Sequence, residues 1–218
     1  MVLNLRASFA LVFSIFIWLH STRFIHAAQS DIDCLRSIKA SLHDPSNYLE
    51  SWNFTNGAKT NICSFLGIDC WNADDNRVLN INLSGLGLVG KFPLGVSNCT
   101  SMTGLDLSNN NLNSHIPKNI SHYTPFVTSL DLSTNRFSGK IPENLANCSY
   151  LNFLKLNNNN LTGQIPEQIG QLKRIRTFDV SNNRLSGRVP DFENNTAVVV
   201  NYANNAGLCG GPLSPCKH

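Results

Sequence analysis

The sequence predicts a solenoid of five stacked coils, each built around one short strand. Five segments share the skeleton L-x-L-x-x-N-x-L-x-G-x-I-P, more weakly in the first, and they end at Pro93, Pro117, Pro142, Pro166 and Pro190. The spacings between these prolines are 24, 25, 24 and 24 residues, a period typical of leucine-rich repeats. One such unit cannot bury its apolar face alone, so neighbouring units have to stack. We therefore expect a leucine-rich repeat solenoid with a parallel sheet on its concave face.

Alternation within each repeat predicts which side chains form the core. The first and third residues of L-x-L point to one face of a strand, and the middle residue points to the other. The expected core residues are Ile81, Leu83, Leu105, Leu107, Leu130, Leu132, Leu154, Leu156, Phe178 and Val180.

Two further residue types, asparagine and glycine, recur at fixed positions in the repeats. Three residues after the strand come Asn110, Asn135, Asn159 and Asn183. We expect these amides to bond backbone groups of their own and adjacent coils rather than a ligand. Four residues later come Gly90, Gly139, Gly163 and Gly187, which suit a positive φ or a close backbone approach. Ser114 replaces glycine in the second repeat, so a local distortion is expected there.

Residues 1–28 have the features of a secretory signal peptide. Arg6 precedes an apolar run from Phe9 to Leu19, and Ala27 and Ala28 offer small residues for cleavage. A transmembrane anchor is the alternative, but the run is short of the roughly 20 residues that a spanning helix needs. Removing Arg6 and Arg23 leaves 15 basic residues against 14 acidic ones. Such a balance does not favour nucleic acid, which selects clustered basic surfaces.

The rest of the chain divides into an amino-terminal cap (29–77), five repeats (78–190) and a carboxyl-terminal cap (191–218). Asp31 is a suitable N-cap for an amphipathic helix with apolar residues at 35, 38 and 42. The large apolar side chains that could cover the first coil are Trp52, Phe65, Ile68 and Trp71. No second hydrophobic span follows, so we expect a secreted protein or the outer portion of a longer one.

Seven cysteines fit an oxidising compartment. Two pairs bracket short turns, and we expect the disulfides Cys63–Cys70 and Cys209–Cys216. The place of Cys34 on the apolar side of its helix favours a buried free thiol over a bridge. Cys99 and Cys148 lie two coils apart, about 10 Å at the usual strand spacing, beyond disulfide reach. Both are expected to be small buried hydrophobes.

Seven sequons match N-x-S/T, as expected of surface glycan acceptors in a secreted chain. Their acceptors are Asn53, Asn82, Asn98, Asn119, Asn147, Asn160 and Asn194. Chance also produces sequons in an asparagine-rich sequence, so occupancy at each site stays open.

The outward positions of the strands form columns on the expected concave face, where solenoids usually bind partners. Phe153 is the one large apolar residue there and resembles an interface anchor. The candidate partner-binding residues are Asp106, Ser108, Asp131, Ser133, Phe153, Lys155, Asn157, Thr177, Asp179 and Ser181. For the aspartates, an ordinary solvated face is the alternative.

A second column lies on the flank between glycine and proline and is mildly basic. It holds Lys91, His115, Lys140, Gln164 and Arg188, and either a soluble flank or a site for acidic polymers would account for it. No metal-spaced His/Cys/Glu cluster, phosphate-binding glycine loop or nucleophile motif occurs. The sequence therefore predicts no enzyme, no cofactor and no metal.

The repeat L-x-L-x-x-N-x-L-x-G-x-I-P resembles the plant-specific leucine-rich repeat, and both caps resemble those of plant receptor-like kinase ectodomains. The wording is most similar to the small five-repeat receptors, often carrying an inactive kinase, that bind somatic-embryogenesis-type co-receptor kinases. The matching segments are DCLRSIKASLHDP, ICSFLGIDCWN, DNRVLNINL, TGLDLSNNNL, TSLDLSTNRFSGKIP, LANCSYLNFLKL and YANNAGLCGGPL.

The resemblance implies an extracellular protein-binding module that restrains immune or growth signalling by sequestering a co-receptor. It also implies a membrane attachment only through a region absent from this chain. Two alternatives remain: a secreted inhibitor similar to polygalacturonase-inhibiting proteins, and a binder of cell-wall polysaccharide or peptide.

Overall fold

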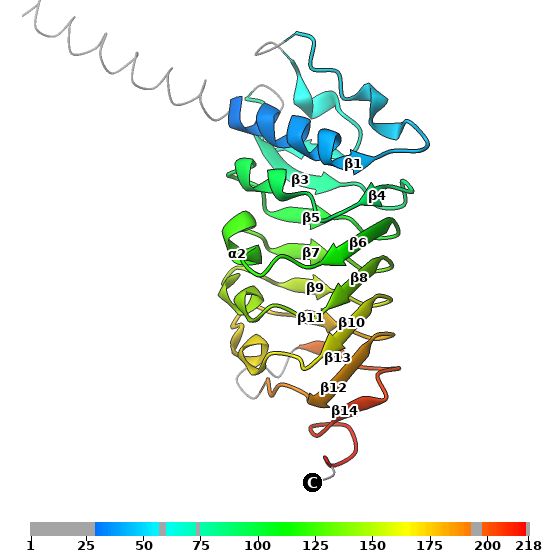
Figure 1. The fold of residues 1–218 in the computed structure, drawn as a ribbon. Coiled ribbons are helices and arrows are strands. Elements are labelled where there is room, and N and C mark those ends of the chain that lie inside the picture. The colour runs from blue at the N-terminus through cyan, green and yellow to red at the C-terminus, as the bar shows by residue number, and fades with distance from the viewer. Residues whose placement is uncertain (1–28, 57–59, 73–74, 193–197, 217–218) are drawn as a thin grey trace, which may run out of the picture.

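A computed structural model describes residues 29–56, 60–72, 75–192 and 198–216. The coils stack along one axis, with a seven-stranded sheet on each of two sides of every coil (Figure 1). The predicted signal peptide and the Asn194 sequon lie outside the described residues. The first sheet has the order β13-β11-β9-β7-β5-β3-β2. Its strands are β2 (Ile68–Cys70), β3 (Val78–Asn82), β5 (Gly104–Asp106), β7 (Ser129–Asp131), β9 (Phe153–Lys155), β11 (Thr177–Asp179) and β13 (Val199–Asn201).

The first sheet contains the L-x-L strands, as predicted. From β3 to β13 all neighbours pair in parallel, so that Leu105 faces Leu130 and Leu130 faces Leu154. All ten expected core residues are at most 1% exposed. The solenoid prediction is therefore confirmed at the level of individual side chains.

The second sheet was not predicted, because the repeat pattern indicated only one strand in each coil, the one that contains L-x-L. Its order is β1-β4-β6-β8-β10-β12-β14. Its strands are β1 (Leu42–His43), β4 (Val89–Gly90), β6 (Asn111–His115), β8 (Arg136–Gly139), β10 (Asn160–Gly163), β12 (Arg184–Arg188) and β14 (Gly207–Cys209). A signal was present, since Asn111 and Asn113 are exposed on either side of the buried Leu112, the period-two alternation of a strand.

Short helices close the first four coils, at the left of Figure 1. They are η4 (Leu94–Asn98), α2 (Ile120–Tyr123), η5 (Glu143–Asn147) and η6 (Glu167–Gln171). In the amino-terminal cap lie η1 (Tyr48–Ser51), η3 (Ile62–Ser64) and a longer helix over residues 29–41.

The recurring asparagines form a buried hydrogen-bond ladder between coils. Asn135 donates to the carbonyls of Leu107, Leu132 and Ser133, and its Oδ1 accepts from the N–H of Leu112. The same four-bond pattern recurs at Asn110, Asn159 and Asn183. The predicted structural role is confirmed, and each amide joins its own coil to the previous one.

The four glycines of the predicted column all have positive φ, and Ser114 keeps that conformation without being a glycine, at φ 123°. The glycines of this column also leave room for side chains on the flank of the solenoid. A Cβ at Gly139 would clash with the ring of His115. The glycine thereby lets a side chain of the preceding coil lie across its backbone.

The amino-terminal cap corrects two predictions, that Cys34 is a buried free thiol and that Cys99 is a small buried hydrophobe without a bridge. Cys34 and Cys99 form a disulfide, with 5.4 Å between their Cα atoms. The sequence could not show that the helix over residues 29–41 packs against η4, where a Cβ at Gly95 would lie 2.5 Å from Ser37 Oγ. The disulfides Cys63–Cys70 and Cys209–Cys216 are confirmed. Cys148 is free and buried, as expected.

Two further expectations for this cap are wrong. Asp31 lies inside the helix rather than at its N-cap, and its Oδ2 accepts a 2.8 Å hydrogen bond from the N–H of Val78. Trp71 does not cover the first coil, because 51% of its surface is exposed. Trp52 and Phe65 do so, stacked at 5.9 Å between ring centroids and nearly buried.

The carboxyl-terminal cap begins as a sixth coil. β13 pairs with β11, β14 pairs with β12, and Asn205 continues the ladder. The segment V-V-N-Y-A-N-N retains the alternation and the asparagine of the repeats but lacks the leucines. Sequence reasoning that relied on leucine therefore missed it.

Asp31 makes stability depend on pH. Burial raises the pKa of its carboxyl from 3.8 to about 6, against the opposing hydrogen bond from Val78. The resulting cost of ionisation is absent below pH 3.8 and grows to about 3 kcal/mol as the pH rises through about 6.

We therefore expect the Asp31→Asn variant to lose stability less steeply than the parent between pH 4 and pH 7, which urea unfolding at both pH values measures. Asp33→Asn on the same helix, where the carboxylate is 46% exposed, is the control and should follow the parent. If the free energy of unfolding of Asp31→Asn changed with pH as steeply as that of the parent, Asp31 would not be the source of the pH dependence.

Candidate functional site: an aromatic protein-binding surface

On the solvent face of the first sheet, polar and apolar side chains of adjacent strands form one column. Ser129, Phe153, Thr177 and Val199 are direct neighbours on β7, β9, β11 and β13. Phe153 is 42% exposed and Val199 is 67% exposed. The prediction of Phe153 as an exposed apolar residue is thus confirmed, and Val199 is a second one, which the repeat pattern did not indicate.

The middle residues of these strands carry charged side chains, and some of them already pair with residues on neighbouring strands. Lys155 Nζ lies 3.2 Å from Asp131 Oδ2, and the lysine is 48% exposed. Asp179 Oδ2 accepts from Asn201 Nδ2 at 3.2 Å. Asp106 is half-buried, beside Asp131 in the register. These carboxylates therefore offer less free charge than their sequence suggests.

The predicted serine contacts have to be corrected. Ser108, Ser133 and Ser181 are buried, at 4–7% exposure. Each N–H donates to Oδ1 of the aspartate two residues earlier, and the hydroxyls of Ser133 and Ser181 do so too. The D-x-S sequence thus forms a turn at the end of each of these three strands, β5, β7 and β11. These serines therefore do not offer a contact surface.

Three exposed aromatic residues lie on the edge that leads into the first sheet. They are Trp71, Phe126 and Tyr150, with exposed fractions of 51%, 48% and 41%. Phe126 and Tyr150 each stand four residues before the inward leucine of their coil, and their ring centroids are 6.0 Å apart. We call Trp71, Phe126, Tyr150 and the arginines stacked on them, Arg77 and Arg174, the aromatic edge.

The two arginines at the ends of the aromatic edge each lie against a ring. The guanidinium of Arg77 is 5.6 Å from the Trp71 ring centroid, and that of Arg174 is 5.3 Å from the Tyr150 ring centroid. Trp71 Nε1 also donates to the carbonyl of Ser101 at 3.0 Å. These contacts hold the side chains in place, so that less rotamer entropy is lost when a partner binds.

A cavity of about 410 Å³ opens between the rings. Its floor includes Thr103 and Thr128, which directly precede β5 and β7 of the first sheet. The backbone here is fixed from coil to coil: Thr128 N donates to Thr103 O, and Asn152 N donates to Thr128 O, both at 2.7 Å. The aromatic edge is therefore a rigid, partly hollow surface beside the column of Phe153.

An exposed aromatic cluster of this kind typically marks a protein interface. Trp, Tyr and Arg are the residues most enriched at binding hot spots, and large exposed apolar patches are uncommon on monomers. Sequence reasoning missed this edge because it compared the columns beside the leucines and not the column four residues earlier. That column reads Ser101, Phe126, Tyr150 and Arg174 in successive coils, which was the available signal.

The sequon asparagines within the described residues are all exposed, namely Asn53, Asn82, Asn98, Asn119, Asn147 and Asn160. Asn82 and Asn160 belong to β3 and β10. None of the six is a member of the aromatic edge, so glycans at these positions would leave its residues unmodified. Occupancy stays a prediction.

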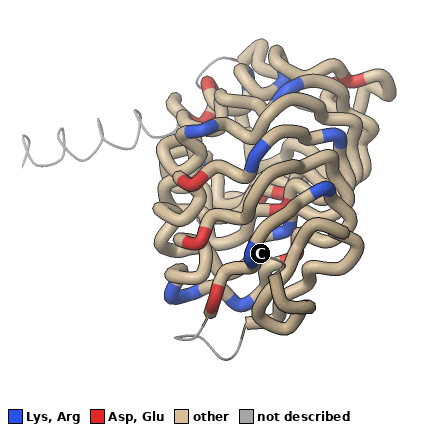
Figure 2. The backbone as a smooth tube through the Cα atoms, turned by 60° about the horizontal axis from the view of Figure 1, so that its bottom comes forward, with Lys and Arg blue, Asp and Glu red and all other residues tan. Residues whose placement is uncertain are grey.

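The charged residues are dispersed rather than gathered into one face. Figure 2 shows basic positions on successive coils with acidic positions interspersed among them. In the part of the chain that the structure describes, there is no group of three or more His, Cys, Asp or Glu arranged to hold a metal ion. Nor does any described helix have the length and apolar character needed to cross a membrane.

Comparisons with known families agree with this fold. The family described as "Leucine rich repeat N-terminal domain" matches residues 28–71, and "Leucine Rich Repeat" matches 101–123, 126–148, 150–172 and 174–195. Together with the exposed aromatic edge, these matches define the class: an extracellular leucine-rich repeat module for protein–protein interaction.

Two solved structures from Arabidopsis thaliana are close to it in fold and sequence. A chain of the BIR3–SERK2 complex has a TM-score of 0.80 and 39% identity, covering 86% of this chain and 100% of that chain. The BIR2 ectodomain has a TM-score of 0.80 and 48% identity, covering 84% and 96%. The chain belongs to the leucine-rich repeat receptor-like kinase family and corresponds to its ectodomain.

The curated relatives are longer proteins. A "probably inactive leucine-rich repeat receptor-like protein kinase" of Arabidopsis thaliana is 56% identical over 209 residues, which are 92% of this chain and 34% of the relative. The "Inactive LRR receptor-like serine/threonine-protein kinase BIR2" is 52% identical over 126 residues, 58% of this chain and 21% of the relative. The chain thus spans about a third or less of their length, the extracellular or cell-surface part.

Proposed function

We propose that this chain binds the ectodomain of a co-receptor kinase, and that it regulates immune or growth signalling by holding that co-receptor. The observation that carries the proposal is the aromatic edge: three exposed rings, fixed by stacked arginines and intercoil hydrogen bonds, on a module of the receptor-kinase family. The complex of BIR3 with SERK2 supports it, because one of its chains matches this chain over most of its length.

The proposed contact surface combines the aromatic edge with the solvent face of the first sheet. Of the residues expected from sequence, the exposed Phe153 and Lys155 belong to it. The half-buried residues would contribute at its margin, namely Asp106, Asp131, Asn157, Thr177 and Asp179. The buried serines of the strand-end turns do not take part. The proposed role is binding rather than catalysis, in keeping with relatives that are named as inactive kinases.

Tyr150→Ala should weaken binding to a SERK-type ectodomain by roughly 30-fold, or about 2 kcal/mol, the effect of a hot-spot aromatic. Truncation removes both the exposed ring and the support that it gives to Phe126 and Arg174. Surface plasmon resonance with the purified co-receptor ectodomain measures the change. The thermal midpoint should stay close to that of the parent, because Tyr150 is 41% exposed.

Tyr48→Ala is the matched control. Tyr48 is 47% exposed, but it lies on η1 of the amino-terminal cap, outside the proposed surface, and its loss should leave binding unchanged. Unaltered affinity in Phe126→Ala/Tyr150→Ala would refute the aromatic edge as the contact. An absence of binding by the parent chain would refute the co-receptor as partner, and polygalacturonase inhibition by the same preparation would favour the inhibitor alternative.

A further inference from the structure

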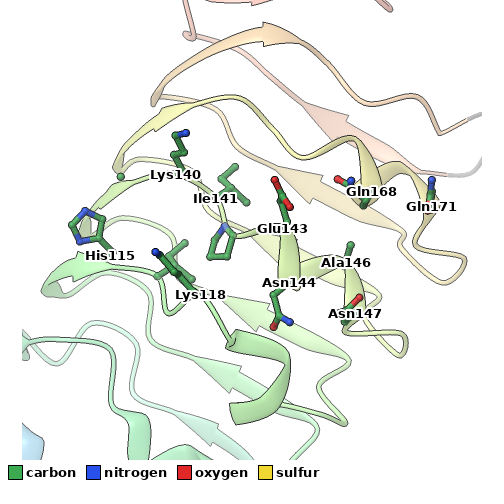
Figure 3. A pocket seen from close by; sticks show the side chains of 13 residues that line it. His115, Lys118, Lys140, Ile141, Glu143, Asn144, Ala146, Asn147, Gln168 and Gln171 are labelled. Atoms are coloured by element: carbon green, nitrogen blue, oxygen red, sulfur yellow. The ribbon is translucent and has the colours of Figure 1, made fainter.

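A groove on a different part of the coils is unexplained by the proposed function. It has a volume of about 980 Å³ and runs from the second sheet to the short helices of the third and fourth coils. Figure 3 shows His115, Lys118 and Lys140 gathered at one end and Gln168 and Gln171 at the other. The aromatic edge lies across the coil, since Phe126 and Tyr150 come after α2 and η5 and before the first sheet.

The basic end of the groove has unpaired charge. Neither Lys118 nor Lys140 takes part in an ion pair or a side-chain hydrogen bond among the described residues. The one carboxylate in the lining, that of Glu143, is likewise in no described ion pair. Each ammonium group is therefore available to pair with an anion. This end therefore favours a negatively charged ligand.

His115 and Lys140 are positioned by the packing of successive coils. The ring of His115 lies across Gly139, and the stem of Lys140 lies across Gly163, where an added Cβ would be 3.1 Å from Lys140 Cγ. Packing of the aliphatic stem fixes the direction of the ammonium group. Binding an anion here costs less ordering than at a freely rotating lysine.

The rest of the lining indicates what carries the negative charge. Its apolar part consists of Ile116, Ile141, Pro142 and Ala146, and its amides are Asn144, Asn147, Gln168 and Gln171. An inorganic anion needs neither a groove of this length nor an apolar floor. A chain of acidic sugars would use the apolar groups, the amides and the lysines together. Its C–H faces pack on the apolar groups, its hydroxyls form hydrogen bonds with the amides, and its carboxylates pair with the lysines.

We propose that this groove binds an acidic oligosaccharide, a short chain of uronic acid residues, with its carboxylates at Lys118 and Lys140 and its hydroxyls at Gln168 and Gln171. Asn147 is an exposed sequon in the lining, and a glycan there would occupy the amide end. The groove is therefore fully open in protein that carries no glycan at this position.

The test is calorimetric titration of the chain with Asn147→Gln, using short oligogalacturonates as the probe. Binding should weaken as salt rises, and Lys118→Ala/Lys140→Ala should weaken it by about 10-fold, as expected for two partly exposed cations. Gln168→Ala/Gln171→Ala should weaken it without changing the salt dependence. Lys91→Ala, at an exposed lysine of the first coil outside the lining, is the matched control and should bind like its parent.

Several results would overturn the proposal. They are an absence of binding, undiminished affinity in the double lysine variant, equal affinity for the fully methyl-esterified oligomer, and equal affinity for polyglutamate of the same charge. Co-receptor binding by the double lysine variant is measured in parallel and should equal that of the parent, so that failure of this site is distinguished from failure of the proposed function.

Discussion

Replacing both Cys34 and Cys99 by alanine should lower the free energy of unfolding by about 4 kcal/mol, or roughly 8 to 16 °C in the thermal midpoint. The bridge spans 65 residues, so its loss frees a long loop in the unfolded chain. It also releases the helix over residues 29–41 from the first coil. Thermal unfolding under non-reducing conditions measures the effect.

The Cys63–Cys70 disulfide provides the comparison within the same cap. Its sequence separation is only 7, and its removal should cost about 2 kcal/mol by the same dependence on loop length. A Cys63→Ala/Cys70→Ala variant as unstable as the Cys34→Ala/Cys99→Ala variant would contradict this account. Cys148→Ala, which removes the buried free thiol, separates loss of a crosslink from loss of sulfur volume.

Asn159→Leu should destabilise the chain by about 4 kcal/mol, because it breaks the ladder at its centre. Asn159 donates to the carbonyls of Leu132, Leu156 and Asn157 at 3.0–3.2 Å, and its Oδ1 accepts from Phe137 N at 2.9 Å. Leucine fills the volume but removes all four hydrogen bonds, each worth about 1 kcal/mol. It leaves the buried N–H of Phe137 without this partner, whereas each of the three carbonyls keeps another donor, from Asn135, Asn183 and Thr134 respectively. Urea unfolding measures the loss.

Asn159→Asp tests whether the hydrogen bonds or the shape matter. The carboxylate can still accept from Phe137, but it faces three carbonyl oxygens that it cannot bond, so a similar loss is expected. Asn113→Ala removes an exposed asparagine of β6 and should change stability by less than about 0.5 kcal/mol. Full stability in Asn159→Asp would show that the amide donors are dispensable.

The structural features that could be predicted from the sequence are those that recur with the leucine period or lie close together in the chain. The ten core residues, the four ladder asparagines and the two short-range disulfides follow from period and spacing, because each is determined within one or two coils. The Cys34–Cys99 disulfide depends on how the first helix docks, which no local pattern encodes. The second sheet and Asn205 were hidden because their segments are short or lack leucine.

The candidate site was predictable only in part. Phe153 stands out because it sits beside the leucine columns and is the one large apolar residue there. Phe126 and Tyr150 occupy a loop position whose side chain is polar in the second and fifth coils, Ser101 and Arg174, so hydrophobicity alone did not distinguish exposed rings from buried ones. The burial of Ser133 follows from its hydrogen bond to Asp131, a contact that depends on the conformation of the turn.

The asparagine ladder also determines where the molecule opens. Each rung joins only neighbouring coils, so the array behaves as a chain of nearest-neighbour couplings, and its two ends have a neighbour on one side only. Local opening therefore starts as fraying at the terminal coils. All three disulfides lie there. Cys63–Cys70 is within the amino-terminal cap, Cys34–Cys99 joins that cap to the first coil, and Cys209–Cys216 begins at the last residue of β14. The central coils, which carry Phe126 and Tyr150, should show the strongest protection from hydrogen exchange.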